Sequence, residues 1–229
     1  MRTAICCSGT GRSINHTIDN LKKNLFNCFD NKKIIIYLTK TDNIEFVKSY
    51  FDGISNIEFL IYEENPIDIS QMIFVDNWPP STKPDLEKGR QIYAQMIKSR
   101  YILAQKFKDI KDEYDCAIFS RLDVIYEKPV SSFVNKDELN DNTVIIPNFH
   151  HHSGINDRFC LSTKNGLIDY LSLYSHFKDM IDSNHVFCAE KTLLNYLKNR
   201  NKKILLKDIK FCRVRKNGVI HEGSFSRLR

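Results

Sequence analysis

The sequence lacks any apolar run long enough to cross a membrane. It also lacks the closely spaced cysteine pairs that would hold a structural zinc ion. A membrane-spanning helix needs about 18 or more consecutive apolar residues. The amino-terminal stretch MRTAICCSGTGRS contains too short an apolar segment for a signal peptide. The absence of a C-x-x-C pair excludes a zinc ribbon, and the seven cysteines are odd in number and scattered. We therefore expect a cytoplasmic protein, soluble or peripheral to a membrane, with reduced cysteines in its core.

The composition is that of an ordinary globular protein, with 42% hydrophobic and 27% charged residues among 229. We expect one domain over residues 1–229, without internal repeats. The formal net charge is +6, with basic clusters at 198–203 (KNRNKK) and 213–216 (RVRK). Such a surplus suits polyanionic ligands in general, from nucleoside diphosphates to RNA or acidic membrane surfaces. The interleaved basic and aromatic pattern of a nucleic-acid-binding surface is missing, so we expect no nucleic-acid partner.

Apolar runs alternate with segments of helical spacing along most of the chain. Strands separated by helices favour right-handed crossovers, so we expect an α/β fold with a mostly parallel central sheet flanked by helices, related to the Rossmann fold. The expected strands are Thr3–Cys7, Lys33–Leu38, Ile57–Tyr62, Tyr114–Phe119, Thr143–Pro147, Arg158–Ser162, Ile204–Leu206 and Ile209–Val214. The expected helices contain 14–25, 44–51, 92–107, 167–177 and 191–197.

Two segments interrupt this alternation. Residues 63–89 hold four of the six prolines and the lone tryptophan. This composition predicts a long irregular loop, either a binding loop or a disordered one. Residues 215–229 are polar and basic and predict a carboxy-terminal tail.

The first strand is followed by the turn SGTGRS and then by an amphipathic helix. Backbone N–H groups of Ser8 and Gly9 and the positive end of the helix are suited to an anion, and Arg12 adds a fixed cation. The turn lacks the lysine of a P-loop and the third glycine of a dinucleotide fingerprint. A plain strand-to-helix turn is the alternative. Thr39 and Lys40 end the second strand and are further candidates for binding the same ligand.

The stretch FSRLDVIYEKP at 119–129 places an arginine and an aspartate at the end of a buried strand. Ligands of open α/β sheets bind beyond the carboxyl ends of the strands. Because side chains alternate along a strand, Arg121 and Asp123 should point to the same side. They predict a ligand site at this edge, with a surface salt bridge as the alternative.

Further polar groups follow later in the chain. Gly154, Asn156 and Asp157 form a small polar loop that could hold sugar hydroxyls, although Asn and Asp also favour simple turns. Glu190 precedes a helical pattern, where an acid can serve as a capping residue. His221 stands alone in the polar tail, where a solvated imidazole is the alternative to a ligand.

Together, these segments resemble a GT-A glycosyltransferase. The resemblance rests on YDCAIFSRLDVIYEKP (114–129), SGINDRFCLSTKNGLIDY (153–170) and HVFCAEKTLLNYL (185–197), in matching order. Within that class, the chain is similar to the small capsule- and virus-associated transferases that carry an R-x-D variant of the usual D-x-D signature.

The resemblance implies roles for particular residues. Asp123 would bind a divalent ion, Mn²⁺ or Mg²⁺, that bridges the two phosphates of a nucleotide-sugar donor, and His221 would complete the metal site. Arg121 replaces the first acidic position, so the dependence on metal is open. Glu190 would act as the catalytic base, and Asp157 is the competing base or an acceptor-binding group beside Gly154 and Asn156.

The reaction implied is transfer of a sugar from a nucleoside diphosphate to a hydroxyl of an oligosaccharide or other glycan. Charge that builds on the leaving phosphate would be stabilised by the ion and nearby cations. A carboxylate that takes the acceptor proton predicts inversion at the anomeric carbon. A module that binds a sugar nucleotide or glycan without turnover is the first alternative, and a nucleic-acid-binding protein is the second. The glycine spacing does not fit a methyltransferase or a dehydrogenase.

Overall fold

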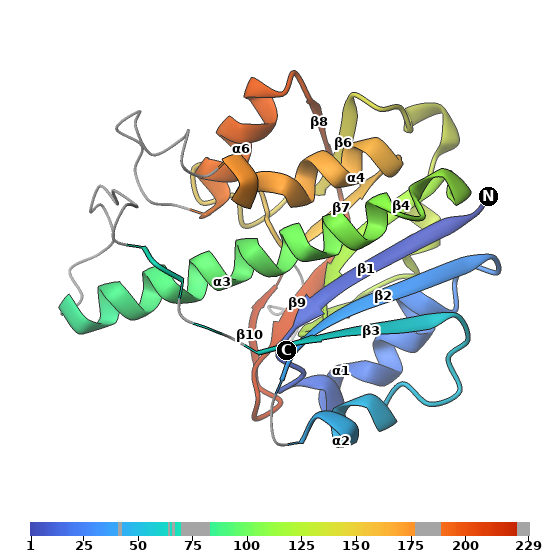
Figure 1. Ribbon diagram of the computed structural model, residues 1–229. Coiled ribbons are helices and arrows are strands. Elements are labelled where there is room, and N and C mark those ends of the chain that lie inside the picture. The colour runs from blue at the N-terminus through green and yellow to red at the C-terminus, as the bar shows by residue number, and fades with distance from the viewer. Residues whose placement is uncertain (41–42, 64, 66, 70–82, 177–188, 224–229) are drawn as a thin grey trace.

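The computed structural model describes residues 1–40, 43–63, 65, 67–69, 83–176 and 189–223, with the side chains of 83–87 and 221–223 left out. Within these residues, seven strands form a central sheet (Figure 1). In spatial order they are β3 (Ile57–Tyr62), β2 (Lys32–Thr39), β1 (Thr3–Gly9), β4 (Cys116–Arg121), β7 (Phe159–Ser162), β6 (Thr143–Pro147) and β8 (Lys203–Lys207). β1 pairs in parallel with β2 and β4, β2 with β3, and β6 with β8, whereas β7 is antiparallel to both of its neighbours. The mostly parallel α/β sheet expected from the sequence is confirmed.

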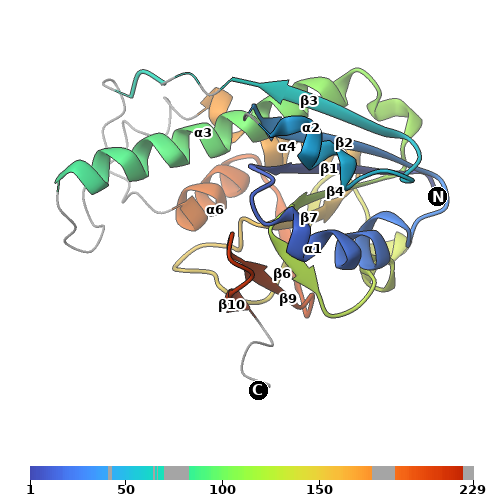
Figure 2. The same ribbon diagram turned by 90° about the horizontal axis from the view of Figure 1, so that it is seen from below.

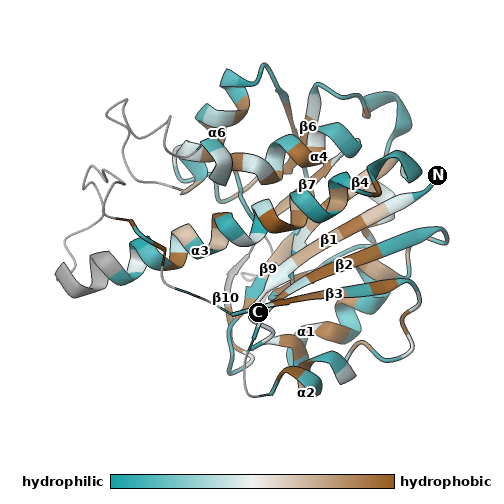
Figure 3. Ribbon diagram, in the orientation of Figure 1, coloured by the Kyte–Doolittle hydropathy of each residue, from teal (hydrophilic) through white to brown (hydrophobic). Residues whose placement is uncertain are grey.

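Helices cover both faces of this sheet. α3 (Lys83–Lys108), α4 (Lys164–Leu171) and α6 (Ala189–Asn199) lie on one face, and α1 (Ile14–Leu21) and α2 (Ile44–Ser49) lie on the other (Figures 1 and 2). The strands β2 and β3 are mainly apolar along their length, while the turns at their ends are hydrophilic (Figure 3). This pattern is typical of a sheet buried on both sides.

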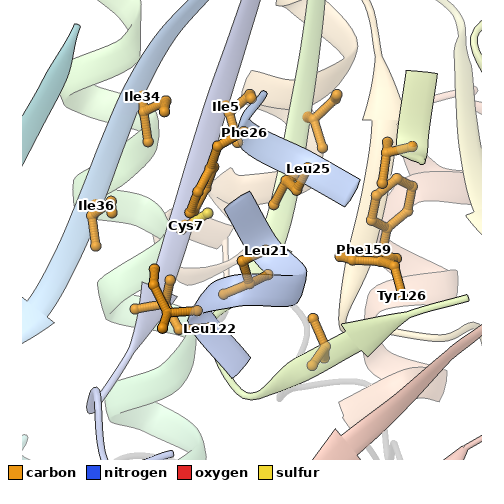
Figure 4. Close-up of a cluster of buried hydrophobic side chains, with 14 of the residues drawn as sticks. Ile5, Cys7, Leu21, Leu25, Phe26, Ile34, Ile36, Leu122, Tyr126 and Phe159 are labelled. Carbon is orange, nitrogen blue, oxygen red and sulfur yellow. The ribbon is translucent and has the colours of Figure 1, made fainter. Parts of the chain in front are cut away.

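Successive side chains of β1 point to opposite faces of the sheet and pack into two separate hydrophobic cores. Ile5 and Cys7 point into the core under α1, where Leu21, Leu25 and Phe26 pack against them (Figure 4). Ala4 and Cys6 point to the opposite core, with α3, α4 and α6. Burial raises the pKa of the Cys6 thiol to about 12, so this cysteine remains a protonated core side chain, as expected.

A small antiparallel sheet lies beside the central one. Its strands are β5 (Val124–Tyr126), β9 (Phe211–Val214) and β10 (Ile220–Gly223), in the order β10-β9-β5. Val124 pairs with Arg213, so the chain that leaves β4 runs directly alongside β9. This pairing brings a segment from the end of the chain to the carboxyl edge of the central sheet.

The structure corrects two expected segments. The predicted loop at 63–89 is wrong for 83–89, because α3 already begins at Lys83. Proline is tolerated in the first turn of a helix, where its missing N–H has no partner to lose, so Pro84 does not delay the helix. The predicted tail from 215 is wrong for Ile220–Gly223, which form β10. Trp78 lies outside the described residues.

None of the helices in the described part of the chain is both long enough and apolar enough to cross a lipid bilayer.

Candidate functional site

A large open cleft lies at the carboxyl edge of the parallel strands. Its volume is about 1860 Å³, and it is lined by the ends of β1, β2, β4 and β9 and by one side of α3. Ser8, Gly9, Arg12, Arg121 and Asp123 all contribute to its wall. The structure therefore brings together the glycine-rich turn and the SRLD segment, which are more than one hundred residues apart in the sequence.

The glycine-rich turn is fixed by its neighbours on three sides. Gly11 has φ +69°, and a Cβ there would lie 2.7 Å from a methyl carbon of Val47 on α2. Only glycine fits both the left-handed backbone and the close approach. Ser13 Oγ donates to the Val214 carbonyl at 2.9 Å, which ties the start of α1 to β9. Arg12 donates from Nε to Thr10 Oγ1 at 2.9 Å and lies exposed at the cleft.

Arg121 and Asp123 form a bidentate ion pair, and a second arginine also donates a hydrogen bond to Asp123. Arg121 donates from Nε to Asp123 Oδ1 and from a terminal nitrogen to Oδ2, both at 2.7 Å. Arg213 on β9 donates from Nε to Oδ2 at 3.0 Å. The three side chains are 21–22% exposed and face the cleft. The salt bridge considered as the alternative is present, yet it forms part of the cleft wall.

The electrostatics of this group follow from burial and from its two cations. Burial opposes ionisation of Asp123, but the charges and hydrogen bonds of Arg121 and Arg213 outweigh it and hold the pKa of that carboxyl well below its usual range. Burial and the neighbouring charge of Arg121 lower the pKa of Arg213, and Asp123 opposes that change. The aspartate thus holds two like charges close together.

The cleft wall as a whole is strongly cationic. Among its described residues, seven side chains are basic and two are acidic, an excess of five positive charges. The basic residues are Arg12, Lys40, Arg100, Arg121, Arg213, Arg215 and Lys216, and the acidic ones are Glu63 and Asp123. A concave surface lined by one sign of charge concentrates the opposite sign, so an anion is the ligand that this cleft suits.

The end of β2 also reaches the cleft. Thr39 and Lys40 both line it, as does Tyr37, which stacks on Tyr62 with ring centroids 5.3 Å apart. Lys40 pairs with Glu63, and this hydrogen bond lowers the pKa of the glutamate. At the end of β2 the cleft is therefore lined by an aromatic ring, Tyr37, and by the oppositely charged Lys40 and Glu63.

The loop at 154–157 lies behind this wall, not in it. Asn156 is 1% exposed, and its amide donates to the Phe149 carbonyl at 3.0 Å while its oxygen accepts from the Arg158 N–H at 2.9 Å. Asp157 is 6% exposed and pairs with Arg100 at 2.9 Å. Burial opposes its ionisation, but Arg100 and then Arg121 lower the pKa of the carboxyl. Asp157 therefore reaches the cleft only through Arg100, which lines it.

Glu190 lies in the first turn of α6, partly exposed, and its backbone packs against the same loop. The Ile155 N–H donates to the Glu190 carbonyl at 3.1 Å. Burial raises the pKa of the Tyr93 hydroxyl on α3, and the negative charges of Asp157 and Glu190 add to the rise. Tyr93 lies within residues 91–100 of α3, the stretch whose other face lines the cleft.

Gly154 lies against the backbone of Glu190, so a substitution there tests how tightly the 154–157 loop packs against α6. A Cβ at this position would lie 2.0 Å from the backbone carbon of Glu190, so Gly154→Ala should force the loop and α6 apart. We expect a loss of about 2 kcal/mol or more in the free energy of unfolding, as for overpacked cores. Urea denaturation of the purified variant measures it.

The matched control is Gly89→Ala in α3, where no atom lies within 4 Å of the added Cβ. It should raise stability by roughly 0.5–1 kcal/mol, because alanine favours a helix over glycine. Equal stability of Gly154→Ala and the native chain would show that the loop moves away at no cost.

A divalent metal does not fit the described side chains of this cleft. No three His, Cys, Asp or Glu side chains gather to hold an ion in the part of the chain that the structure describes. Both carboxylate oxygens of Asp123 accept hydrogen bonds from arginines, and Glu63 pairs with Lys40. The side chain of His221 lies outside the described residues. Asp123 with a bound ion was the expectation, and the described groups do not supply the ligands for it.

Sequence analysis did not single out two arginines of the site. Arg213 was noted only as part of the basic cluster RVRK, which supplies three of the seven basic side chains of the cleft. Arg100 lies within a helical stretch with no signal of its own, although a buried arginine requires an anionic partner. The run of charge at 213–216 was the signal that could have identified Arg213.

Comparison with known proteins bears on the fold. No family model matches the sequence, and the comparison with curated proteins gave no match. Among solved structures, the galactosyltransferase LgtC, in complex with donor and acceptor sugar analogues, matches over 90% of this chain and 73% of its own, with a TM-score of 0.54 and 12% identity. The glycosyltransferase GlyE of Streptococcus pneumoniae TIGR4 matches over 90% of this chain and 45% of its own, with a TM-score of 0.50 and 13% identity.

The chain therefore has the GT-A-like fold of these glycosyltransferases, as the sequence predicted. At 12–13% identity the likeness concerns the arrangement of the backbone alone. What the cleft does is argued from its own residues.

Proposed function

We propose that the protein is a glycosyltransferase that moves a sugar from a nucleoside-diphosphate sugar to a hydroxyl of a glycan. The observation that carries this proposal is the cationic cleft at the carboxyl edge of the sheet, whose described residues have an excess of five basic side chains. A diphosphate is the part of such a donor that this wall recognises. The fold shared with LgtC and GlyE, both of them glycosyltransferases by name, supports the same class.

The donor would lie across the cleft with its diphosphate between the glycine-rich turn and the β4 end. Ser8 and Gly9 end β1 at the floor of this site, and Arg12 and Arg121 would offer guanidinium groups on either side. Thr39 and Lys40 at the end of β2 would then contact the nucleoside part. In this proposal Arg121 and Asp123 would correspond to an R-x-D variant of the D-x-D signature, like that of the small capsule- and virus-associated transferases which the sequence resembles.

The chemistry that the cleft favours is departure of the nucleoside diphosphate. Negative charge grows on the phosphate as the bond to the sugar breaks. Guanidinium groups held in place before the reaction stabilise that charge without reorganising. Fixed cations at the wall would therefore lower the barrier more than they tighten binding of the intact donor.

The acceptor would approach from the side of the 154–157 loop. Asp157 pairs with Arg100, and Glu190 lies in the first turn of α6 beside the same loop, outside the described cleft lining. From the resemblance to GT-A transferases we assign Glu190 as the base that removes the acceptor proton and Asp157 as the residue that holds Arg100 in the wall. Gly154 and Asn156 shape the backbone between them. Attack by a hydroxyl deprotonated in this way predicts inversion at the anomeric carbon.

The experiment is a donor screen on the purified protein. Uridine, guanosine, cytidine, adenosine and thymidine diphosphate sugars are incubated with the protein in the presence of Mn²⁺ and Mg²⁺, and released diphosphate is measured alongside calorimetric binding. We expect one nucleotide class to bind and to be hydrolysed slowly without an acceptor. Binding without any turnover would favour a sugar-nucleotide-binding module, and neither binding nor turnover would reject the proposal.

A further inference from the structure

Asp123 shares its carboxylate between two arginines that both face the cleft. Its Oδ1 accepts from Arg121 at 2.7 Å, and its Oδ2 accepts from Arg121 at 2.7 Å and from Arg213 at 3.0 Å. An ion pair that served only to stabilise the fold would have no need to lie in the wall of the cleft. This one lines it, with about a fifth of each side chain exposed.

We propose that Arg121 and Arg213, aligned by Asp123, bind the diphosphate in the place where a divalent metal ion would otherwise bridge it. The inference rests on the proposed function and adds to it that donor binding and transfer need no metal. Asp123 is then a positioning residue, and the two arginines are the groups that touch the substrate.

The carboxylate that would have to hold a metal is already occupied. A dication at Asp123 would displace two guanidinium groups and would lie next to their charges. Arg12, Arg215 and Lys216 line the same cleft and add to the positive potential. The wall already carries the charge that an ion would supply.

The arginine pair is held by backbone as well as by Asp123. Val214 donates its N–H to the Asp123 carbonyl at 2.8 Å, and Val124 pairs with Arg213 between β5 and β9. Ser13 at the glycine-rich turn bonds to the carbonyl of Val214 at 2.9 Å. Three segments of the chain therefore fix the backbone on either side of Asp123 and Arg213, and the bonds to Asp123 orient the two guanidinium groups, which is the preorganisation that charge stabilisation requires.

Arginine suits this task because its planar group gives two parallel hydrogen bonds to phosphate oxygens. Both guanidinium groups donate to the same carboxylate. Oxygens of an incoming diphosphate can accept some of these hydrogen bonds in place of Asp123, and the arginines need not move. No covalent or redox step is added to the transfer reaction, since the arginines only accept the growing charge of the leaving group.

The test is calorimetric titration of the full chain with uridine, guanosine, cytidine and adenosine diphosphate, once in excess EDTA and once in excess Mn²⁺. We expect the best ligand to bind with dissociation constants that differ by less than about threefold between the two conditions. Donor turnover should likewise persist in EDTA. Binding that is more than about tenfold tighter with Mn²⁺, or turnover that EDTA abolishes, would overturn the inference and leave the glycosyltransferase proposal intact.

Variants separate the roles of the three residues. Arg213→Met should weaken diphosphate binding in EDTA by about tenfold or more, because a charge-assisted hydrogen bond is lost. The control Arg200→Met removes an arginine that also pairs with an aspartate, Asp169 at 2.8 Å, but outside the cleft lining, and it should bind as the native chain does. Equal affinity of both variants would overturn the inference.

Asp123→Asn distinguishes an arginine clamp from a metal site most directly. A metal site would lose its ligand and its diphosphate affinity together. The clamp keeps both arginines, so affinity should stay within about tenfold of the native value both in EDTA and in Mn²⁺, while kcat falls further than affinity because the arginines lose their alignment. Loss of all binding in a variant that melts like the native chain would overturn the inference. Absence of binding and turnover in the native chain under both conditions would instead reject the proposed function itself.

Discussion

Replacing Asp157 with asparagine should lower the free energy of unfolding by about 3–5 kcal/mol, the cost of breaking a buried ion pair from one side. Arg100 and Asp157 are 3% and 6% exposed and lie 2.9 Å apart. Arg100 Nε is also buried and has no hydrogen-bond partner among the described residues, so the aspartate is its main compensation. Urea denaturation measures the loss.

Two further variants show whether this cost comes from the unpaired charge. Asp112→Asn breaks the pair with Lys164, whose aspartate side chain is 80% exposed, and should change stability by less than about 1 kcal/mol. The double variant Arg100→Met with Asp157→Leu removes both charges and should regain a large part of the loss. A single variant as stable as the native chain would mean that Arg100 reaches solvent or another partner at no cost.

The pH dependence of the free energy of unfolding should also report the ion pair between Arg100 and Asp157. The pKa of Asp157 is lower in the folded chain than in the unfolded chain, where it is about 3.9. Its contribution is therefore complete above the unfolded value and is lost as pH falls through the folded value. Asp157→Asn should consequently lose less stability than the native chain on acidification below about pH 4.

The strands could be predicted because each is an apolar run with polar residues at its ends. Thr143–Pro147 has the bounds expected from the sequence, since burial on both faces leaves a continuous apolar signal. Ile57–Tyr62 also has the expected bounds, although β3 is a partly exposed edge strand. The positions of Arg121 and Asp123 beside the glycine-rich turn followed from the rule that parallel strands present their carboxyl ends at one edge.

The contacts that complete the site could not be predicted in the same way. Arg213 meets Asp123 across 90 residues through strands of only three and four residues, β5 and β9, which leave almost no periodic signal. Asp157 looked like an exposed sugar-binding acid because its turn is polar. Its actual partner, Arg100, is 57 residues away on a helix whose sequence shows no break at that position. Long-range pairing of charge, and not local propensity, decides the roles of these residues.

Glu190 is the residue that we propose as the catalytic base. Replacing Glu190 with glutamine should lower kcat for sugar transfer by about 10²–10⁴-fold, the usual contribution of a general base. Glutamine keeps the size of the side chain and the backbone contact with Ile155, so the dissociation constant of the donor diphosphate should stay unchanged. Transfer assays with the donor from the screen, together with calorimetry, separate the two effects.

The stereochemistry of the product supplies an independent check on Glu190. A base that activates the acceptor hydroxyl implies attack on the face opposite the leaving diphosphate, and the anomeric configuration of the product, read by NMR, should be inverted. The native pH profile of kcat should show an acidic limb that Glu190→Gln removes, because that limb reports protonation of the base. Asp157→Asn, assayed well below its melting temperature, should keep this limb, since its carboxylate is bound to Arg100. A retained configuration with full activity in Glu190→Gln would move the base elsewhere and leave Glu190 as a charge at the start of α6.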